Sequence, residues 1–190
     1  MKIGYFIENY KKGGVDTFLE NLTSSKNLFD QIYVISNKNN PGLKNLKKNN
    51  IKIILYSIFS WDMILNKFSN SLIKFFFKIL YSLFFPVTFL YQAIRLYFFL
   101  KKIKLEKIMI VTGGYPGGDI CLAAAIVSSK IYPDKKPWIN FHNFALKRYQ
   151  SLLLNIYKDY IDKLILSSVV GFVSVSKVSP KSIKLRKNLY

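Results

Sequence analysis

Six short apolar segments separated by helix-like segments are the feature that most restricts the fold of this chain. The apolar segments are residues 2–8, 31–36, 51–57, 107–112, 138–142 and 169–176. Between them, segments 15–26, 120–130 and 148–166 read as helices, the first with apolar residues spaced by three and four. Strands that are apolar on both faces and alternate with helices indicate a parallel sheet covered on both sides. The pattern therefore predicts a doubly wound α/β domain.

The segment 61–104 is too long for an ordinary connection between two strands. Residues 79–94 carry no charge, and Pro86 lies near the middle of this run. A membrane-spanning helix needs about 20 apolar residues, so the run is close to that length. On a helical wheel the basic residues gather on one narrow face; they are Lys67, Lys74, Lys78 and Arg95.

Three interpretations of this segment stay open. It could be a helix pair packed on the sheet with its lysines toward water. It could be an amphipathic helix on an anionic membrane surface, held there by the four basic residues. It could also span the membrane.

Charge and composition narrow the class of partner. The chain has 190 residues, 29 of them basic and 10 acidic, and a formal charge of +19. Only three basic residues are arginine, and lysine is dispersed along the chain. Proteins that read duplexes favour arginine, and no nucleic-acid-binding motif is present, so we expect no nucleic acid partner. Biased coding sequence or attraction to anionic lipid explains the lysines better.

Cysteine and histidine usage argues against metal chemistry. Cys121 and His142 are single, which excludes an internal disulfide framework and a clustered zinc site. We therefore expect neither a metal nor another cofactor. The apolar run before Glu8 is shorter than the core of a secretory signal, so a cytoplasmic location is predicted.

Three polar or glycine-rich segments directly follow predicted strands. They are the Gly13-Gly14 pair, the run from Gly113 to Asp119, and His142-Asn143. Ligands of doubly wound sheets bind outside the carboxyl ends of the strands. We expect His142 to be catalytic and the following residues to contact ligand: Gly13, Gly14, Gly114, Tyr115, Gly117, Gly118, Asp119 and Asn143.

Simpler interpretations of these segments exist. The glycine pair matches neither the dinucleotide fingerprint nor the P-loop and could be a tight turn. The second run could be a mobile loop in which Asp119 caps the next helix. A lone histidine can also be structural.

Five segments in order resemble a known family. KIGYFIEN, GGVDTFLENL, VTGGYPGGD, WINFHNFA and VGFVSVSK are similar to motifs of the N-terminal, acceptor-side domain of glycosyltransferase family 4. The resemblance implies a Rossmann-like domain over residues 1–178, one half of a GT-B pair, with 61–104 as a helical insertion. It implies retaining transfer from a nucleotide sugar to a glycan or lipid-linked acceptor in cell-surface polysaccharide synthesis, without a metal.

The resemblance also assigns roles to individual residues. Gly13 and Gly14 match the glycine loop near the donor phosphates. His142 matches the active-site histidine beside the transferred sugar. Ser176 matches the serine that ends the last strand of the domain.

The family's second domain, which carries an E-x7-E motif, would begin where this chain ends, with 179–190 as a tail or an interdomain segment. We expect a truncated chain that is inactive alone, or a separate chain that supplies the second domain. Its expected location is peripheral, on the inner face of the membrane. The alternative is a non-catalytic, membrane-associated binding module derived from such an enzyme.

Overall fold

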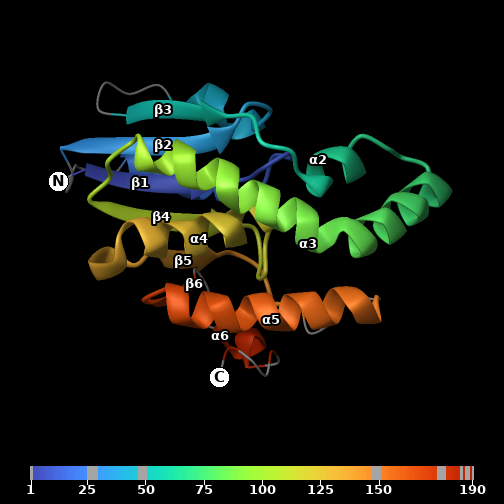
Figure 1. Cartoon of the computed structure of the whole chain (residues 1–190). Helices are drawn as coiled ribbons and strands as arrows, with labels where there is room; N and C mark the ends of the chain where they lie inside the picture. Colours follow the sequence, from blue (N-terminus) through green and yellow to red (C-terminus); the bar gives the residue numbers. More distant parts are fainter. Residues whose placement is uncertain are drawn as a thin grey trace.

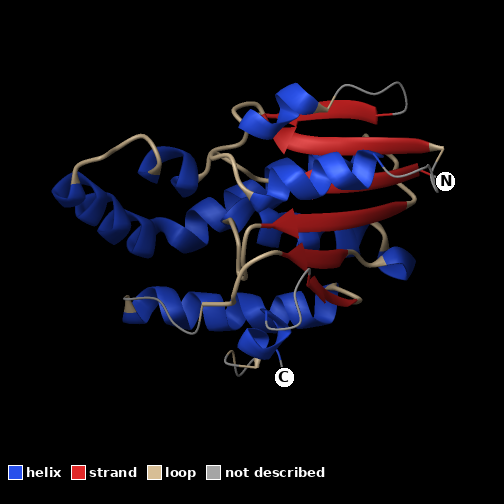
Figure 2. Cartoon of the chain, turned by 180° about the vertical axis from the view of Figure 1, so that it is seen from behind, coloured by secondary structure: helices blue, strands red, loops and turns tan. Residues whose placement is uncertain are grey.

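A single parallel sheet organises the computed structural model, which describes residues 2–24, 30–46, 51–146, 151–174, 179–184, 186 and 189. Its strand order is β3-β2-β1-β4-β5-β6, and every neighbouring pair is parallel (Figures 1 and 2). This is the strand order of a Rossmann-like sheet. The strands are β1 (Lys2–Ile7), β2 (Gln31–Asn37), β3 (Ile51–Tyr56), β4 (Lys107–Thr112), β5 (Trp138–Phe141) and β6 (Gly171–Ser174).

Helices connect these strands, as the sequence pattern predicts. They are α1 (Gly14–Ser24), α2 (Trp61–Leu65), α3 (Ser71–Lys101), α4 (Asp119–Ile131), α5 (Leu152–Ser168) and α6 (Ser179–Ile183), with 3₁₀ turns η1 (Pro41–Asn45) and η2 (Pro133–Lys135). The alternative interpretation, in which Asp119 caps α4, is wrong: Gly118 is the N-cap, and it makes no side-chain hydrogen bond.

Two hydrophobic cores lie on opposite faces of the sheet, because successive side chains of a strand point to opposite sides. On one face Phe6 and Ile35 pack with the apolar side chains of α3, α4 and α5. On the other face Tyr5 and Val34 pack with residues of α1 and η1. Because all six strands are parallel, every loop that follows a strand lies at the same edge of the sheet.

The long insertion forms one short helix and one long one. The 31-residue helix α3 begins after Asn70, whose side chain accepts hydrogen bonds from the Leu72 and Ile73 amides, and it contains Pro86. Lys67 therefore lies outside α3, and the four basic residues do not share one helix. Figure 1 shows α3 extending beyond the sheet edge, where it passes α2.

Helix α3 packs apolar residues such as Phe85 and Leu96 into the core while Lys78 and Arg95 face solvent, but its inward side is not purely apolar. Its inward side includes fully buried Gln92, which lies at the same angle on the wheel as half-buried Lys74. The Gln92 side chain donates to the Phe59 carbonyl at 3.0 Å, and the Trp61 indole donates to the Thr88 hydroxyl at 3.1 Å. Polar contacts thus help to fix α3 to the α2 segment, which turns the other side of the helix outward.

A stripe of large apolar residues runs along the outward side of α3. We call it the outer face, and it consists of Leu72, Phe76, Ile79, Leu83, Val87, Leu90, Ile94 and Phe98, each between 45% and 76% exposed. Among the described residues, α3 is the one helix long and apolar enough to cross a membrane, and only 17% of its most apolar 18-residue stretch is buried. A continuous apolar surface of this extent is typical of a site that contacts protein or membrane.

Candidate functional site

A cavity of about 210 Å³ opens at the carboxyl edge of the sheet. It is formed where the loop after β1, the helix α2 and the loop after β4 meet. Its lining residues are Glu8, Asn9, Tyr10, Lys11, Val15, Asp62, Asn66, Gly113 and Gly118. We call it the edge cavity. It brings together the loop ahead of Gly13-Gly14 and both ends of the second glycine-rich run, as the strand pattern predicts.

Glu8 directly follows strand β1 and lies in the wall of the edge cavity. Burial and the nearby carboxylates of Asp62 and Asp119 raise its pKa to about 8, against hydrogen bonds from Ser60 and Tyr10 that favour the charged form. The Tyr10 hydroxyl donates to Glu8 Oε1 at 3.0 Å. Glu8 is therefore mostly protonated at pH 7, and a neutral carboxyl group can both donate and accept a hydrogen bond.

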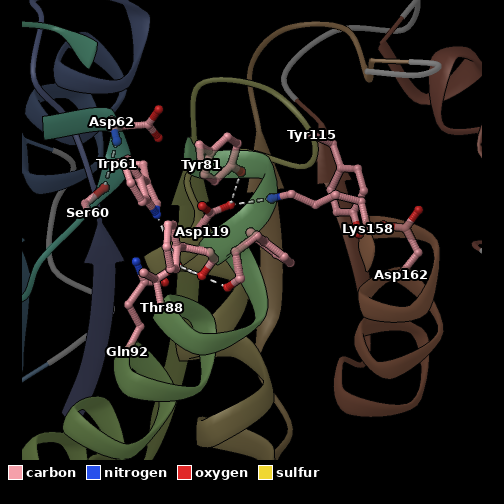
Figure 3. A network of polar contacts seen from close by, with 12 residues as sticks. Ser60, Trp61, Asp62, Tyr81, Thr88, Gln92, Tyr115, Asp119, Lys158 and Asp162 are labelled. Carbon is pink, nitrogen blue, oxygen red and sulfur yellow. Dashed lines mark hydrogen bonds and ion pairs between the residues drawn. The ribbon is translucent and has the colours of Figure 1, made fainter. Parts of the chain in front are cut away.

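Two more carboxylates, Asp62 and Asp119, each at the start of a helix, lie close enough to Glu8 to raise its pKa; Figure 3 shows both side chains. Asp62 follows Ser60, whose hydroxyl accepts from the Asp62 amide at 3.2 Å. Burial and the charge of Asp119 raise the pKa of Asp62 to about 6, while Lys158 opposes the shift. Like charges in a poorly solvated place favour protonation, so this cluster binds protons more tightly than separate carboxylates do.

Lys158 of α5 neutralises the deepest carboxylate. Its ammonium group is buried and pairs with Asp119 Oδ1, which also accepts from the Tyr81 hydroxyl at 3.0 Å. The ammonium lies 4.6 Å from the centre of the Phe85 ring, a cation–π contact. The pair joins α4, α5 and α3, so it couples the edge cavity to the long helix.

The first glycine loop is partly occupied by a side chain of this protein. Asp16 in α1 accepts from the Gly13 amide at 2.9 Å and from the Asn9 side chain at 2.8 Å. A Cβ at Gly13 or Gly14 would meet nothing within 4 Å, so open space lies beside both residues. A phosphate bound at the Gly13 amide would have to displace the Asp16 carboxylate, because both are acceptors for the same donor.

The second glycine loop has mixed roles. Gly117 has a φ of +72°, which L side chains rarely adopt, and a Cβ there would approach the Thr112 side chain to 2.8 Å. A Cβ at Gly114 would lie 3.2 Å from the Phe144 carbonyl. Only Gly118 of the predicted binding residues in this run also lines the edge cavity.

Tyr115 points into the interior instead of toward the edge (Figure 3). Its hydroxyl donates to Asp162 Oδ1 at 2.9 Å, and Arg186 donates to the other oxygen of Asp162 at 2.6 Å. The predicted contact of Tyr115 with ligand is replaced here by a contact that ties the loop after β4 to α5 and the C-terminal segment.

His142 directly follows β5, and its ring packs edge-on against Phe18 of α1 at 4.8 Å. Burial lowers its pKa, so the imidazole is neutral at pH 7. Its Nε2 is shielded and has no hydrogen-bond partner among the residues the structure describes. The side chain of Asn143 is exposed, and its backbone amide donates to the Gly113 carbonyl at 2.8 Å, which joins the loops after β5 and β4.

The predicted site residues therefore separate into groups. Gly118 lies in the edge cavity, and Asp119 lies beside it in the carboxylate cluster. Gly13, Gly14, His142 and Asn143 lie on strand-end loops but are not among the described residues that line this cavity. Ser176 lies outside the described residues. Of the four basic residues, Lys67, Lys78 and Arg95 are exposed and Lys74 is half-buried.

Sequence reasoning missed Glu8, Asp62 and Lys158. The sequence could have indicated Glu8, because it is a carboxylate directly after an apolar strand. Asp62 and Lys158 lie in helices, where no local sequence pattern distinguishes them. Among the described residues no three His, Cys, Asp or Glu side chains are arranged to hold a metal ion. Comparison of the chain with protein-family models, with curated proteins and with solved structures finds no match.

Proposed function

We propose that this chain is the acceptor-side half of a retaining glycosyltransferase similar to family 4, a doubly wound domain of a GT-B pair. The observation that carries the proposal is the edge cavity, where the loops after β1 and β4 meet at the carboxyl edge of a 3-2-1-4-5-6 sheet. Ligands of such sheets bind at this edge, near the reversal of strand order between β1 and β4. The edge cavity supports a ligand site, and the proposal that the ligand is a sugar comes from the five motifs that resemble family 4.

In the proposed reaction an acceptor hydroxyl bonds to C1 of the donor sugar. The bond from C1 to the nucleotide diphosphate breaks with retention, and the hydroxyl proton passes to the leaving phosphate. The edge cavity would hold the acceptor: the neutral Glu8 carboxyl group and Asn9 supply donors and acceptors for sugar hydroxyls. His142 would contact the transferred sugar, and its unpaired Nε2 is the kind of atom that a ligand hydroxyl satisfies. No metal enters this scheme.

We further propose that the outer face of α3 rests on the inner face of a membrane, which would place a lipid-linked acceptor near the edge cavity. Its support is the exposed apolar stripe and the formal charge of +19, which attracts anionic headgroups. The chain leads into α3 from α2 and leaves it toward β4, so both connections stay with this domain and the helix would lie in the membrane surface.

The test uses the chain fused to the donor-binding domain of a family 4 glycosyltransferase. Release of nucleoside diphosphate is measured with UDP-glucose or GDP-mannose and with polyprenyl phosphate or a short glycan as acceptor. We expect turnover from the fusion and none from the 190-residue chain alone. His142→Ala should lower turnover at least about tenfold, equivalent to about 1.4 kcal/mol of barrier, with Tm nearly unchanged.

Phe144→Ala is the matched control, because Phe144 is exposed and lies two residues beyond His142. It should keep full turnover. Full activity of His142→Ala would remove His142 from the chemistry. No turnover of the fusion with any donor and acceptor would overturn the proposed activity. In that case the second candidate, a non-catalytic membrane-binding module, would be favoured by the outer face of α3 alone.

A further inference from the structure

A second, larger cavity lies between the projecting half of α3 and the start of α5. Its volume is about 640 Å³, within the range of small-molecule sites. The lining residues are Leu65, Phe75, Lys78, Ile79, Tyr81, Ser82, Leu83, Ser151, Leu153 and Leu154. We call it the helix cavity. Its wall is mostly aliphatic and aromatic, so an apolar ligand fits it better than a sugar or a nucleotide.

The polar groups of this wall are almost all engaged within the protein. The Tyr81 hydroxyl donates to Asp119 at 3.0 Å, and the Ser82 hydroxyl donates to the Lys78 carbonyl at 3.0 Å. The Ser151 hydroxyl accepts from the Leu154 amide at 3.3 Å. They leave little for a polar ligand to bind.

Lys78 is different. It is the one charged residue among the described residues that line the cavity. Its ammonium group makes no ion pair with a carboxylate in the described part of the chain. The helix cavity therefore offers a long apolar wall and one available cation, which is complementary to a hydrocarbon chain that ends in an anionic group.

The cavity wall is continuous with the outer face of α3. Ile79 and Leu83 belong to both, and Phe75 beside them is 64% exposed. Figure 1 shows α3 and α5 extending past the sheet edge on the same side. A chain could therefore move from a bilayer on the outer face into the helix cavity without crossing water.

We propose that the helix cavity binds the hydrocarbon chain of an anionic bilayer lipid, with the Lys78 ammonium paired to the lipid phosphate. The inference rests on the proposed membrane contact and deepens it by placing one lipid molecule. Because Tyr81 lines this cavity and also contacts Asp119, the bound lipid would lie next to the carboxylate cluster at the edge cavity.

The experiment uses the full chain with vesicles of 30% phosphatidylglycerol and 70% phosphatidylcholine. The vesicles contain a trace of phosphatidylglycerol with a photoactivatable diazirine near the end of one acyl chain. After irradiation, mass spectrometry maps the labelled residues. We expect label on Leu153 and Leu154 of α5, since these are half-buried and buried and do not belong to the outer face.

Two matched pairs of variants separate the cavity from the membrane contact. Ile79→Trp fills the cavity and should lower the α5 label at least fivefold without loss of vesicle binding. Leu90→Trp adds the same side chain to the outer face away from the cavity and should keep the label. Lys78→Gln should remove the preference for the phosphatidylglycerol probe over a phosphatidylcholine probe. Lys135→Gln, in the exposed η2 turn and not among the described residues that line the helix cavity, should preserve it.

The outcomes distinguish this inference from the proposed function. Label confined to the outer face, or equal α5 label in Ile79→Trp and the unaltered chain, would overturn the lipid site while the membrane contact stands. Failure to sediment with vesicles would overturn the membrane contact. The cavity is then tested by a soluble photoactivatable lysophosphatidylglycerol below its micelle concentration. Label on α5 from that probe would support the cavity, and its absence would overturn it.

Discussion

Glu8 provides the sharpest physical test of the carboxylate cluster. Its pKa rises from 4.5 to about 8 on folding, so the folded chain holds a proton that the unfolded chain has released. The free energy of unfolding therefore falls as the pH rises from 4.5 to 8, because the folded state binds more protons in that range. Glu8→Gln keeps the size of the side chain and an acceptor for Tyr10, and it removes the titration.

The magnitude follows from the two pKa values. Linkage with values of 4.5 and about 8 gives a contribution of about 1.4 kcal/mol at pH 7 and about 0.2 kcal/mol at pH 8.5. Between these pH values the unaltered chain should lose about 1.2 kcal/mol more stability than Glu8→Gln. This window lies above the pKa of about 6 for Asp62, so Asp62 adds little to the difference.

The assay is urea unfolding in a mild non-ionic detergent at half-unit steps from pH 6.5 to pH 8.5, followed by tryptophan fluorescence. Trp61 lies in α2 and its indole donates a hydrogen bond to Thr88 of α3, so its fluorescence reports on the contact between these two helices. Glu106→Gln is the control, because Glu106 is exposed and its side chain accepts a hydrogen bond from the Lys2 amide, at the opposite end of β1 from Glu8. It should run parallel to the unaltered chain. Parallel curves for Glu8→Gln as well would show that Glu8 is already ionised in the folded protein and would refute the reasoning.

Three further changes test other parts of the structure. Val87→Glu combined with Leu90→Glu should leave Tm nearly unchanged, since both residues are more than 60% exposed. In a sedimentation assay the double variant should bind vesicles about 100-fold more weakly, because it removes about 3 kcal/mol of apolar burial in the membrane. Two glutamates added to the η2 turn should lower vesicle affinity much less. Lys158→Met should cost about 3–5 kcal/mol in urea unfolding, because it leaves a buried carboxylate unpaired, and adding Asp119→Leu should restore most of the loss. An equal loss in the double variant would contradict that account. Gly117→Ala should destabilise the chain by about 1–3 kcal/mol, because Gly117 has a φ of +72° and its Cβ would lie 2.8 Å from the Thr112 side chain; thermal unfolding at the wild-type temperature would contradict this.

Strand positions followed from the sequence because the strands of a doubly covered sheet need apolar residues on both faces. Each predicted strand lies within a few residues of an observed one, and 107–112 coincides with β4. The end of the last predicted strand, including Ser176, lies outside the described residues. The prediction that loops after β1 and β4 meet at one edge is confirmed by the edge cavity. That outcome depends only on parallel strands ending at the same side.

The details of the site depended on contacts that no local pattern records. Glu8, Asp62, Asp119 and Lys158 are far apart in the chain, and they meet because α2, α4 and α5 converge beside the end of β1. Tyr115 shows the reverse: its place in a glycine-rich run predicted a ligand contact, and the fold engages it with Asp162 in the interior. The roles of His142, Gly13 and Gly14 stay predictions.

Helix α3 shows most clearly where the sequence stops being sufficient. The wheel of residues 61–104 separated a polar side from an apolar side, but it could not say which side meets the protein. Trp61 and the Phe59 carbonyl bind Thr88 and Gln92 and hold these two polar residues inward, whereas Lys78 and Arg95 stay exposed. Local sequence determined the strands, the helices and the amphipathic division, because these depend on spacing along the chain. Tertiary structure decided which face of α3 is exposed and which carboxylates raise one another's pKa, because both depend on side chains brought together from distant segments.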